Sequence, residues 1–192
     1  MITPVLSILI PSTSDRDGLL GKLLFDLSKQ IEENNAEKLV EIITDVDNYE
    51  RTTGAKRNDL LERSKGIFVV AIDSDDEVSP YYIKEILLAA ESDCDAIGIT
   101  GWMTTNGRNL RKWDISKDHD YIMILDEDGK ELYLRFNNHI SPIKRSIAIQ
   151  FKFPDKNFGE DYEWAVQINK SGLIKKETKI IPPLYHYKYI KK

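Results

Sequence analysis

Short β-branched runs alternate with stretches of helical apolar periodicity over the first hundred residues, and this alternation constrains the fold more than any other feature. Strands are expected at 5–10, 39–44, 67–72 and 96–100. Helices are expected between them, starting at Asp17, at Gly54 and at Ser79-Pro80. The first strand is expected to stop at Pro11. Strands and helices in this order form a sheet covered by helices, so the sequence predicts an α/β fold.

The second half is less regular. Residues 101–120 are rich in Gly, Asn, Thr and Trp and are expected to be irregular. Further elements are expected as strands at 121–125, 131–135 and 173–181, a short helix from Ser141-Pro142 and a longer helix at 159–170. A length of 192 residues with 41% hydrophobic residues fits one domain with a full core.

Composition excludes several classes of protein. The 27 basic residues and 32 acidic residues give a net charge of -5, which disfavours duplex nucleic acid and anionic lipid as partners. No apolar run approaches the roughly 20 residues of a membrane helix, and no signal peptide is visible. Cys94 is the only cysteine, so an internal disulfide is excluded. A location in the reducing cytoplasm is the expectation.

Three carboxylates follow the third expected strand in Asp73-Ser74-Asp75-Asp76. The carboxyl ends of strands are where open α/β sheets bind ligands. Crowded carboxylates repel one another unless a cation lies among them, which predicts Mg²⁺ or Mn²⁺ and a phosphorylated ligand. A calcium loop is a poorer explanation, because Val78 stands where that loop requires glycine. The alternative is a solvated acidic turn that caps a helix.

Four segments in this order resemble the inverting nucleotide-sugar glycosyltransferases of family 2. They are Ser7-Ile-Leu-Ile-Pro-Ser12, Gly54-Ala-Lys-Arg-Asn58 with Lys65-Gly66 behind it, the acidic cluster at 73–76, and Phe158-Gly-Glu-Asp-Tyr162. The resemblance spans nearly the whole chain and implies the GT-A fold, a mixed sheet flanked by helices. It also implies a single domain over 1–192, with a nucleotide-sugar-binding half at 1–100 and an acceptor and catalytic half at 101–192.

The resemblance assigns donor and metal roles to residues of the first half. Those implied in donor binding are Pro11, Asp45, Asp47, Arg57, Asp73 and Asp75. Asp75 resembles the principal metal ligand, Asp73 a carboxylate near the metal or the donor ribose, and Asp76 a supporting group. The choice between Asp45 and Asp47 as the base-recognising aspartate stays open. Arg57 has an alternative role as an ion pair that holds its helix.

In the second half, Asp161 resembles the general base that deprotonates the acceptor hydroxyl. Its alternative is a helix-start carboxylate, favoured by the helix dipole. His186 resembles an additional metal ligand, which would suit Mn²⁺ better than Mg²⁺, and its alternative is a surface strand residue.

Three further residues of this half are candidates for the acceptor region. His139 precedes a short expected helix and is a candidate for contact with the acceptor or the diphosphate, or else a loop histidine bonded to backbone. Trp102 and Trp113 flank the polar segment and are candidates for stacking on an acceptor sugar, or else core residues.

Together these features indicate a metal-dependent transferase that moves a hexose from a nucleotide diphosphate sugar, with a UDP-sugar favoured, to an acceptor hydroxyl. A nucleotidyltransferase of related fold is one alternative, although residues 11–18 offer no glycine-rich phosphate cradle. A non-catalytic nucleotide-sugar-binding module is the other. The acceptor, the sugar and the oligomeric state are left open by the sequence.

Overall fold

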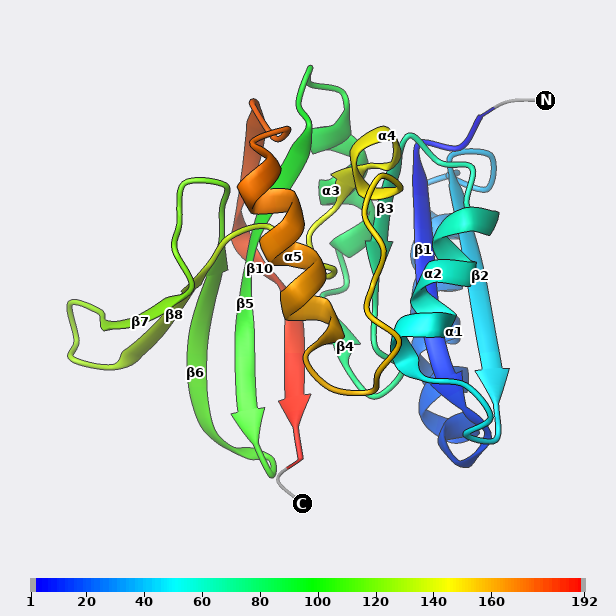
Figure 1. Ribbon diagram of the computed structural model, residues 1–192, viewed down its shortest axis with the longest axis horizontal. Helices are drawn as coiled ribbons and strands as arrows, with labels where there is room; N and C mark the ends of the chain where they lie inside the picture. The colour runs from blue at the N-terminus through cyan, green and yellow to red at the C-terminus, as the bar shows by residue number, and fades with distance from the viewer. Residues whose placement is uncertain (1–2, 191–192) are drawn as a thin grey trace.

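A computed structural model describes residues 3–190, and its centre is one ten-stranded mixed sheet (Figure 1). The main strand order is β2-β1-β3-β9-β5-β6-β8-β7, and β10 pairs with both β5 and β4. The strands are β1 (Leu6–Thr13), β2 (Val40–Asp47), β3 (Phe68–Ala71), β4 (Glu77–Val78), β5 (Ala96–Thr105), β6 (Arg108–Ile115), β7 (Ile122–Leu125), β8 (Glu131–Arg135), β9 (Ile143–Lys144) and β10 (Glu177–Tyr189).

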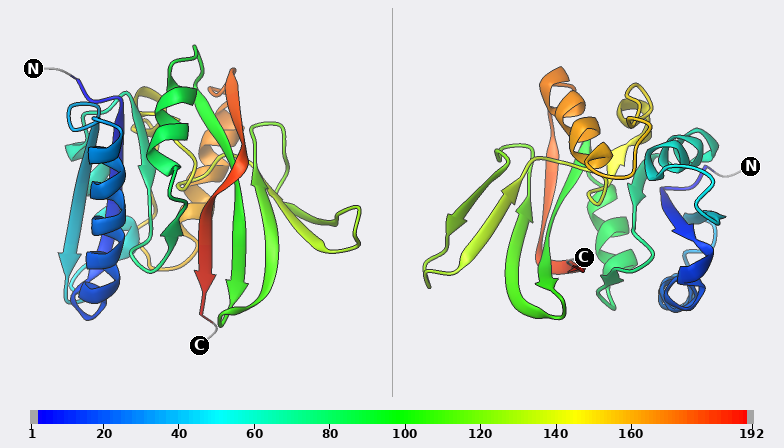
Figure 2. Two further views of the ribbon diagram at one scale, coloured as in Figure 1. Left: turned by 180° about the vertical axis from the view of Figure 1, so that it is seen from behind. Right: turned by 60° about the horizontal axis from the view of Figure 1, so that its bottom comes forward.

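Helices cover both faces of the sheet. They are α1 (Asp17–Glu33), α2 (Thr53–Arg63), α3 (Tyr82–Ala90), α4 (Arg145–Ala148) and α5 (Glu160–Ser171), with a 3-10 turn η1 (Ser14–Arg16) before α1. Helices α2, α4 and α5 lie in front of the sheet in Figure 1, and α1 and α3 lie behind it (Figure 2). Each face has its own apolar cluster, built on Leu27 and Ile83 behind the sheet and on Leu60 and Trp164 in front. The predicted α/β class is confirmed.

Strand β1 continues through Pro11, where the sequence predicted that it would stop. Pro11 pairs with Asp45 of β2, whereas the pairing of β1 with β3 ends at Leu9 and Ala71. The Leu9 carbonyl accepts a hydrogen bond from the backbone N–H of Ile72, the residue directly after β3. Since backbone groups two residues apart point to the same side, the missing N–H of Pro11 faces the side where β3 has already ended. Proline therefore costs the sheet no hydrogen bond there.

The expectation that residues 101–120 are irregular is wrong. Strand β5 runs to Thr105 and forms an antiparallel hairpin with β6. The turn is Asn106-Gly107, with φ of 49° and 70°. This dipeptide favours two consecutive left-handed residues, the geometry of a tight hairpin. The Asn106-Gly107 dipeptide is therefore the sequence pattern that predicts a second strand, β6, after β5.

Two helices begin later than predicted. Before α3, the backbone N–H of Ser79 donates to Leu184 and its carbonyl accepts from Gln30, so a turn precedes the helix. Before α4, the Ser141 hydroxyl accepts from the Asn138 N–H, and the short strand β9 follows. In both cases tertiary pairing replaces the Ser-Pro helix start.

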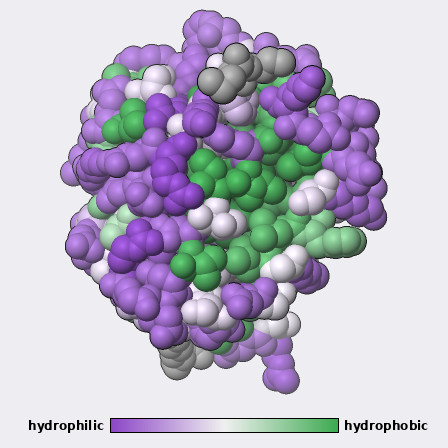
Figure 3. Space-filling view, turned by 90° about the vertical axis from the view of Figure 1, so that its right-hand side faces the viewer, coloured by the Kyte–Doolittle hydropathy of each residue, from purple (hydrophilic) through white to green (hydrophobic). Residues whose placement is uncertain are grey.

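Strands β2 and β7 form the two ends of the main strand order. Apolar residues form a band across the side of the molecule at β2, bordered by polar residues (Figure 3). Every residue of β7 is exposed.

None of the helices within residues 3–190 has the length and apolar character that crossing a membrane requires.

Candidate functional site

The carboxyl ends of β1, β2 and β3 lie at one end of the sheet, and the first turns of α2 and α5 lie at the same end (Figure 1). Side chains join these elements. The Ser12 hydroxyl at the end of β1 donates to the Ser74 hydroxyl in the acidic cluster at 2.9 Å. The buried ammonium of Lys56 donates to the Ser12 carbonyl at 2.7 Å and to Asp47 at 2.6 Å. The ends of β1 and β2, the start of α2 and the acidic cluster are therefore joined by side-chain hydrogen bonds.

Asp47 organises the loop after β2. Its carboxylate accepts from Lys56 and from the backbone N–H groups of Tyr49 and Arg51. The hydrogen bond from Lys56 holds the pKa of Asp47 below its usual value. All of these bonds are internal to the protein, so Asp47 acts as a structural anchor of the loop.

Asp45 has a different environment. It lies beside Pro11 in the sheet register, is 6% exposed, and forms an ion pair with Arg51 through Oδ1. Its other oxygen, Oδ2, is buried without a hydrogen-bond partner in the protein. A buried carboxylate oxygen without a partner is costly unless a ligand supplies a donor. Of the two aspartates that the sequence left open, Asp45 is the one with an acceptor to offer.

Arg57 is the central cation of the site. Its guanidinium is 3% exposed, donates to Asp73 at 2.7 Å and lies 3.3 Å from the Glu160 carboxylate. Arg57 therefore joins α2 to the end of β3 and to the start of α5, which fits the ion-pair interpretation. Burial is the largest influence on Asp73 and opposes its ionisation, but Arg57, His139 and Arg16 together outweigh burial and hold the pKa of Asp73 well below its usual range.

Gly54 allows the first turn of α2 to pack closely against the segment 154–156. Its N–H donates to the Lys156 carbonyl at 3.1 Å. A Cβ at this position would lie 1.9 Å from the Pro154 carbonyl oxygen. The glycine of the Gly54-x-x-Arg57-Asn58 segment is therefore required by packing, and Asn58 adds two bonds to the Phe153 backbone.

His139 lies between two of the predicted site carboxylates. Its Nε2 is 3.8 Å from Oδ2 of Asp73, and its Nδ1 is 3.5 Å from Oδ2 of Asp161. The imidazole is 10% exposed, and Nδ1 has no hydrogen-bond partner. The backbone of His139 is fixed separately, because its carbonyl accepts from the N–H of Ala71 at 2.7 Å. The ring therefore brings the end of β3 and the start of α5 together.

The other two carboxylates of the acidic cluster differ in exposure. Asp75 is 27% exposed and lies 3.1 Å from Arg16. Burial and then the Asp73 charge raise the pKa of Asp75 despite Arg16. Asp76 is buried and accepts from the Tyr185 hydroxyl and the Lys188 N–H, each at 2.7 Å. Asp76 therefore holds β10 against the cluster and is unavailable to solvent.

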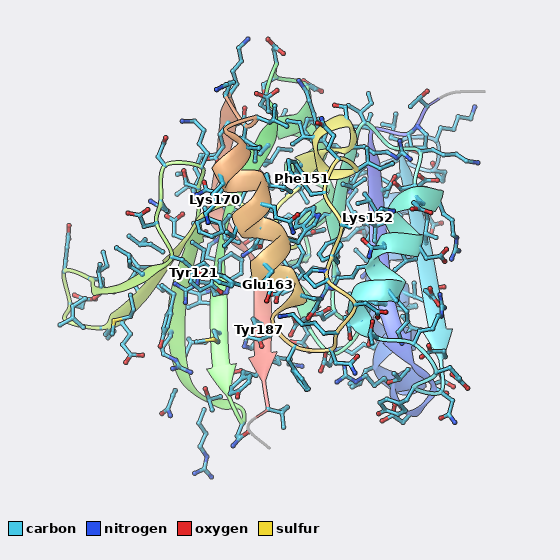
Figure 4. The ribbon with its side chains drawn as sticks, in the orientation of Figure 1. Tyr121, Phe151, Lys152, Glu163, Lys170 and Tyr187 are labelled. Atoms are coloured by element: carbon cyan, nitrogen blue, oxygen red, sulfur yellow. The ribbon has the colours of Figure 1, made fainter. Side chains whose placement is uncertain are left out.

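Tyr187 of β10 reaches the same region, close to the start of α5 (Figure 4). Burial, followed by the charges of Asp76, Asp73 and Asp161, raises the pKa of its phenol. A neutral hydroxyl therefore lies among the site carboxylates. The sequence offered no motif for it.

His186 lies on the other face of β10. Its Nε2 is 3.0 Å from the Thr104 hydroxyl and its Nδ1 is 3.8 Å from Glu77. Neighbouring strand residues point to opposite faces, and Tyr185 and Tyr187 take the face toward the acidic cluster. The prediction that His186 ligates the metal therefore finds no support in this geometry. Within residues 3–190, no group of three or more His, Cys, Asp or Glu side chains is arranged to hold a metal ion.

The two tryptophans do not reach the site. Trp113 is 6% exposed, donates from its indole to the Trp102 carbonyl and packs edge-on against Tyr185. It is a core residue. Trp102 is half-buried, lies beside His186 in the register of β5 and β10, and has the Lys112 ammonium over its ring. It belongs to the face of the sheet away from Asp161.

Comparisons with known proteins agree with the fold. Residues 26–158 match the family described as Glycosyl transferase family 2. A search of curated proteins found no match. Among solved structures, TarS residues 1–349 from S. aureus in complex with UDP-GlcNAc aligns with a TM-score of 0.64 at 15% identity, covering 97% of this chain and 59% of that chain.

The same TarS fragment in complex with UDP aligns with a TM-score of 0.63 at 16% identity, covering 95% of this chain and 60% of that one. The chain thus spans about three fifths of the TarS fragment. At this identity the likeness shows the fold alone, which is the GT-A fold that the resemblance implied. Since the matching segment exceeds half of the sequence, the chain belongs to glycosyl transferase family 2.

Proposed function

We propose that this chain transfers a hexose from a UDP-sugar to an acceptor hydroxyl and inverts the anomeric centre in one displacement. The observation that carries the proposal is the convergence of Asp73, from the end of β3, and Asp161, from the start of α5, on the two nitrogens of His139. A donor-side carboxylate and a candidate base are thereby held side by side. The TarS complexes with UDP-GlcNAc and UDP support the choice of a UDP-sugar.

The two halves of the single domain would have different roles, one in binding the donor and the other in catalysis. Residues 1–100 supply the donor residues of β1, β2, α2 and the acidic cluster, and residues 101–192 supply His139 and Asp161. The division has one exception in β10, because Tyr185 and Tyr187 reach back to the acidic carboxylates of the first half.

Asp45 would recognise the nucleobase. The N3–H of uracil is a donor, and Oδ2 of Asp45 is a buried acceptor without a partner. The neighbouring ion pair with Arg51 orients the carboxylate. Pro11 lies beside Asp45 in the register of β1 and β2.

Asp161 would act as the general base. The acceptor hydroxyl loses its proton to Asp161 while its oxygen forms a bond to the anomeric carbon. The bond from that carbon to the diphosphate breaks, and its electron pair leaves with UDP. Asp161 is 35% exposed, so an acceptor can reach its carboxylate from solvent.

Asp73 and Asp75 would hold a divalent cation, Mn²⁺ or Mg²⁺. Both are oxygen donors that are 27% exposed, and both belong to the acidic cluster that follows β3. The donor set fits a cation that takes its remaining ligands from the diphosphate. Such a cation would neutralise the charge of the leaving diphosphate. His186 is not part of this proposed set.

The test is turnover of nucleotide sugars by the purified chain. It is incubated with UDP-GlcNAc, UDP-glucose, UDP-galactose and GDP-mannose, with Mn²⁺ or Mg²⁺ and a panel of saccharide, protein and lipid-linked acceptors, and release of the nucleoside diphosphate is followed. We expect UDP release by the parent and a loss of about 10²- to 10⁴-fold in Asp161→Asn, with unchanged affinity for UDP. Exchange of pyrophosphate would instead identify a nucleotidyltransferase. Tight binding without turnover would identify a binding module.

A further inference from the structure

Two half-exposed tyrosines lie next to Asp161, and neither takes part in the proposed chemistry. Tyr162 follows Asp161 in the first turn of α5, and Tyr121 precedes β7. Their ring centroids are 4.8 Å apart with the planes at 69°. Their exposed fractions are 44% and 41%. Figure 4 shows Tyr121 on the side of α5 that faces the β7–β8 hairpin.

The pair is held rigidly from behind. The buried ring of Phe136 lies 5.5 Å from Tyr121 and 6.4 Å from Tyr162, measured between centroids. The Arg135 guanidinium lies 3.8 Å from the Tyr121 centroid and donates to the carbonyls of Ile122 and Leu134. Rings fixed in this way lose little freedom when a ligand binds, so they contribute more of their contact energy to affinity.

The pair is also close to the reacting carboxylate. Burial raises the pKa of the Tyr121 phenol, and the Asp161 charge adds to that shift although the Arg135 charge opposes it. Among residues 3–190, no carboxylate lies within ion-pair distance of Arg135. This patch, formed by Tyr121, Tyr162 and Arg135, therefore combines aromatic surface with positive charge at the edge of the candidate base.

We infer that Tyr121 and Tyr162 form the platform for the sugar ring that carries the acceptor hydroxyl, so that the acceptor is a saccharide. This inference rests on the proposed function. The C–H bonds on one face of a pyranose carry partial positive charge and pack against the negative face of an aromatic ring. Its hydroxyl groups accept hydrogen bonds from a guanidinium. A lipid tail would offer no acceptor to the remaining N–H groups of Arg135, whose NH1 group alone donates to the Ile122 and Leu134 carbonyls.

The two tryptophans that the sequence offered as candidates for stacking on an acceptor sugar are not part of this patch. Trp113 lies in the core and Trp102 on the face away from Asp161. The tyrosine pair forms only when the β7–β8 hairpin is placed beside α5, because the two residues are far apart in the chain.

The experiment measures two Michaelis constants in parallel. UDP release is followed with UDP-GlcNAc, or whichever UDP-sugar the parent consumes, in the presence of a panel of methyl pyranosides and short oligosaccharides. The variants are Tyr121→Ala, Tyr162→Ala, Tyr121→Phe and Tyr162→Phe. Phe25→Ala serves as the matched control, since Phe25 is an aromatic residue of α1 with 68% exposure and lies on the other face of the sheet.

We expect each alanine variant to raise the KM for the saccharide by about threefold to tenfold and to change the KM for the donor by less than twofold. The phenylalanine variants keep the ring and should stay within about twofold of the parent for both constants, as should Phe25→Ala. Circular dichroism checks that the alanine variants are folded. The phenylalanine variants keep the ring packing and therefore serve as folded controls for each position.

The inference is overturned if the alanine variants leave the saccharide KM unchanged, or if they raise both constants together. It is also overturned if the parent consumes a UDP-sugar but no saccharide stimulates UDP release. Failure of the proposed function has a different signature, namely no consumption of any nucleotide sugar by the parent.

Discussion

The Nδ1 atom of His139 lies 3.5 Å from the Oδ2 atom of Asp161, and it is the only described imidazole nitrogen so close to that carboxylate. An orienting group beside a general base limits the positions that the base can adopt, and misplacement of a base by about 1 Å can cost roughly 100-fold in rate. We therefore expect His139→Ala to lower kcat for UDP-sugar turnover by about 10- to 100-fold. The KM for the donor should change much less.

Two further substitutions separate the two nitrogens of this ring. Asparagine places its amide near the position of Nδ1, toward Asp161, and glutamine places its amide near Nε2, toward Asp73. We expect His139→Asn to recover more of kcat than His139→Gln. Better recovery by glutamine would show that His139 acts through Asp73 and not through the base.

Asp75→Asn removes one of the two carboxylate charges of the proposed cation site. We expect it to weaken Mn²⁺-dependent binding of UDP by about 10- to 100-fold in calorimetry, because a neutral amide is a poorer ligand than a carboxylate. Asp128→Asn, in the exposed turn between β7 and β8, is the matched control and should bind like the parent. His186→Ala should also bind like the parent, since its ring contacts Thr104 and Glu77. A loss of metal affinity in His186→Ala would restore the original assignment.

Asp45→Asn tests recognition of the base. Arg51 pairs with Oδ1 of Asp45, so an asparagine would turn its oxygen to Arg51 and its NH₂ group to the base. A donor in that place opposes the N3–H of uracil and matches the N3 acceptor of cytosine. We expect UDP binding to fall by about tenfold or more and CDP binding to improve relative to UDP. Equal losses for both nucleotides would remove Asp45 from the base subsite.

Glu77 of β4 makes stability depend on pH. Hydrogen bonds from Lys188 and Lys22 lower the pKa of Glu77 from 4.5 to about 2. A lowered folded-state pKa contributes stability above the unfolded value, and that contribution is lost as the pH falls from 4.5 toward 2. In urea unfolding at pH 7, Glu77→Gln should cost less than about 1 kcal/mol, because the group is partly exposed and solvent screens the pairs.

The difference between Glu77→Gln and the parent should shrink steadily as the pH is lowered through that window. Glu33→Gln, which alters an exposed pair with Lys29 on α1, gives the background for a surface charge. A difference for Glu77→Gln that stays constant down to pH 3 would show that the effect is not the ionisation of this carboxyl group.

Gly54→Ala and Gly21→Ala form a pair with opposite expected signs. A Cβ on Gly54 would meet the Pro154 carbonyl at 1.9 Å, whereas nothing lies within 4 Å of a Cβ on Gly21, which lies in the second turn of α1. We expect Gly54→Ala to lower the melting temperature and, by shifting Arg57, to reduce turnover. Gly21→Ala should stabilise the fold by about 0.5–1 kcal/mol with turnover unchanged. An active and stable Gly54→Ala would mean that the α2 contact is looser than its geometry indicates.

Local patterns predicted the donor half of the fold well. Buried runs such as Phe68–Ala71 and amphipathic stretches such as Asp17–Glu33 carry their own periodicity, so their places could be predicted without knowledge of their partners. Strand β6 could also have been predicted, because Asn106-Gly107 is a hairpin turn signal. The later starts of α3 and α4 could not, since contacts with Leu184 and Asn138 decide them.

The residues of the candidate site also divide into those that local sequence predicts and those that tertiary contacts place. Motif spacing placed Asp73 and Arg57 in one region, and the structure gives them a direct ion pair. The positions of His139 and Tyr187 depend on how the second half folds over the first, and no motif marks them. His186 shows the limit most clearly, because a shift of one residue along β10 exchanges the two faces of the sheet.

The β7–β8 hairpin is hydrogen-bonded to the rest of the described sheet along β6, at the edge away from β1, β2 and β3. Residues 116–135 can therefore change in length or sequence while the strands that carry Asp45 and Asp73 keep their register. Under the proposed function, exchange of this hairpin would change the acceptor preference and leave the nucleotide preference unaltered. Chimeras that graft this hairpin between relatives would separate the preference for the acceptor from the preference for the nucleotide.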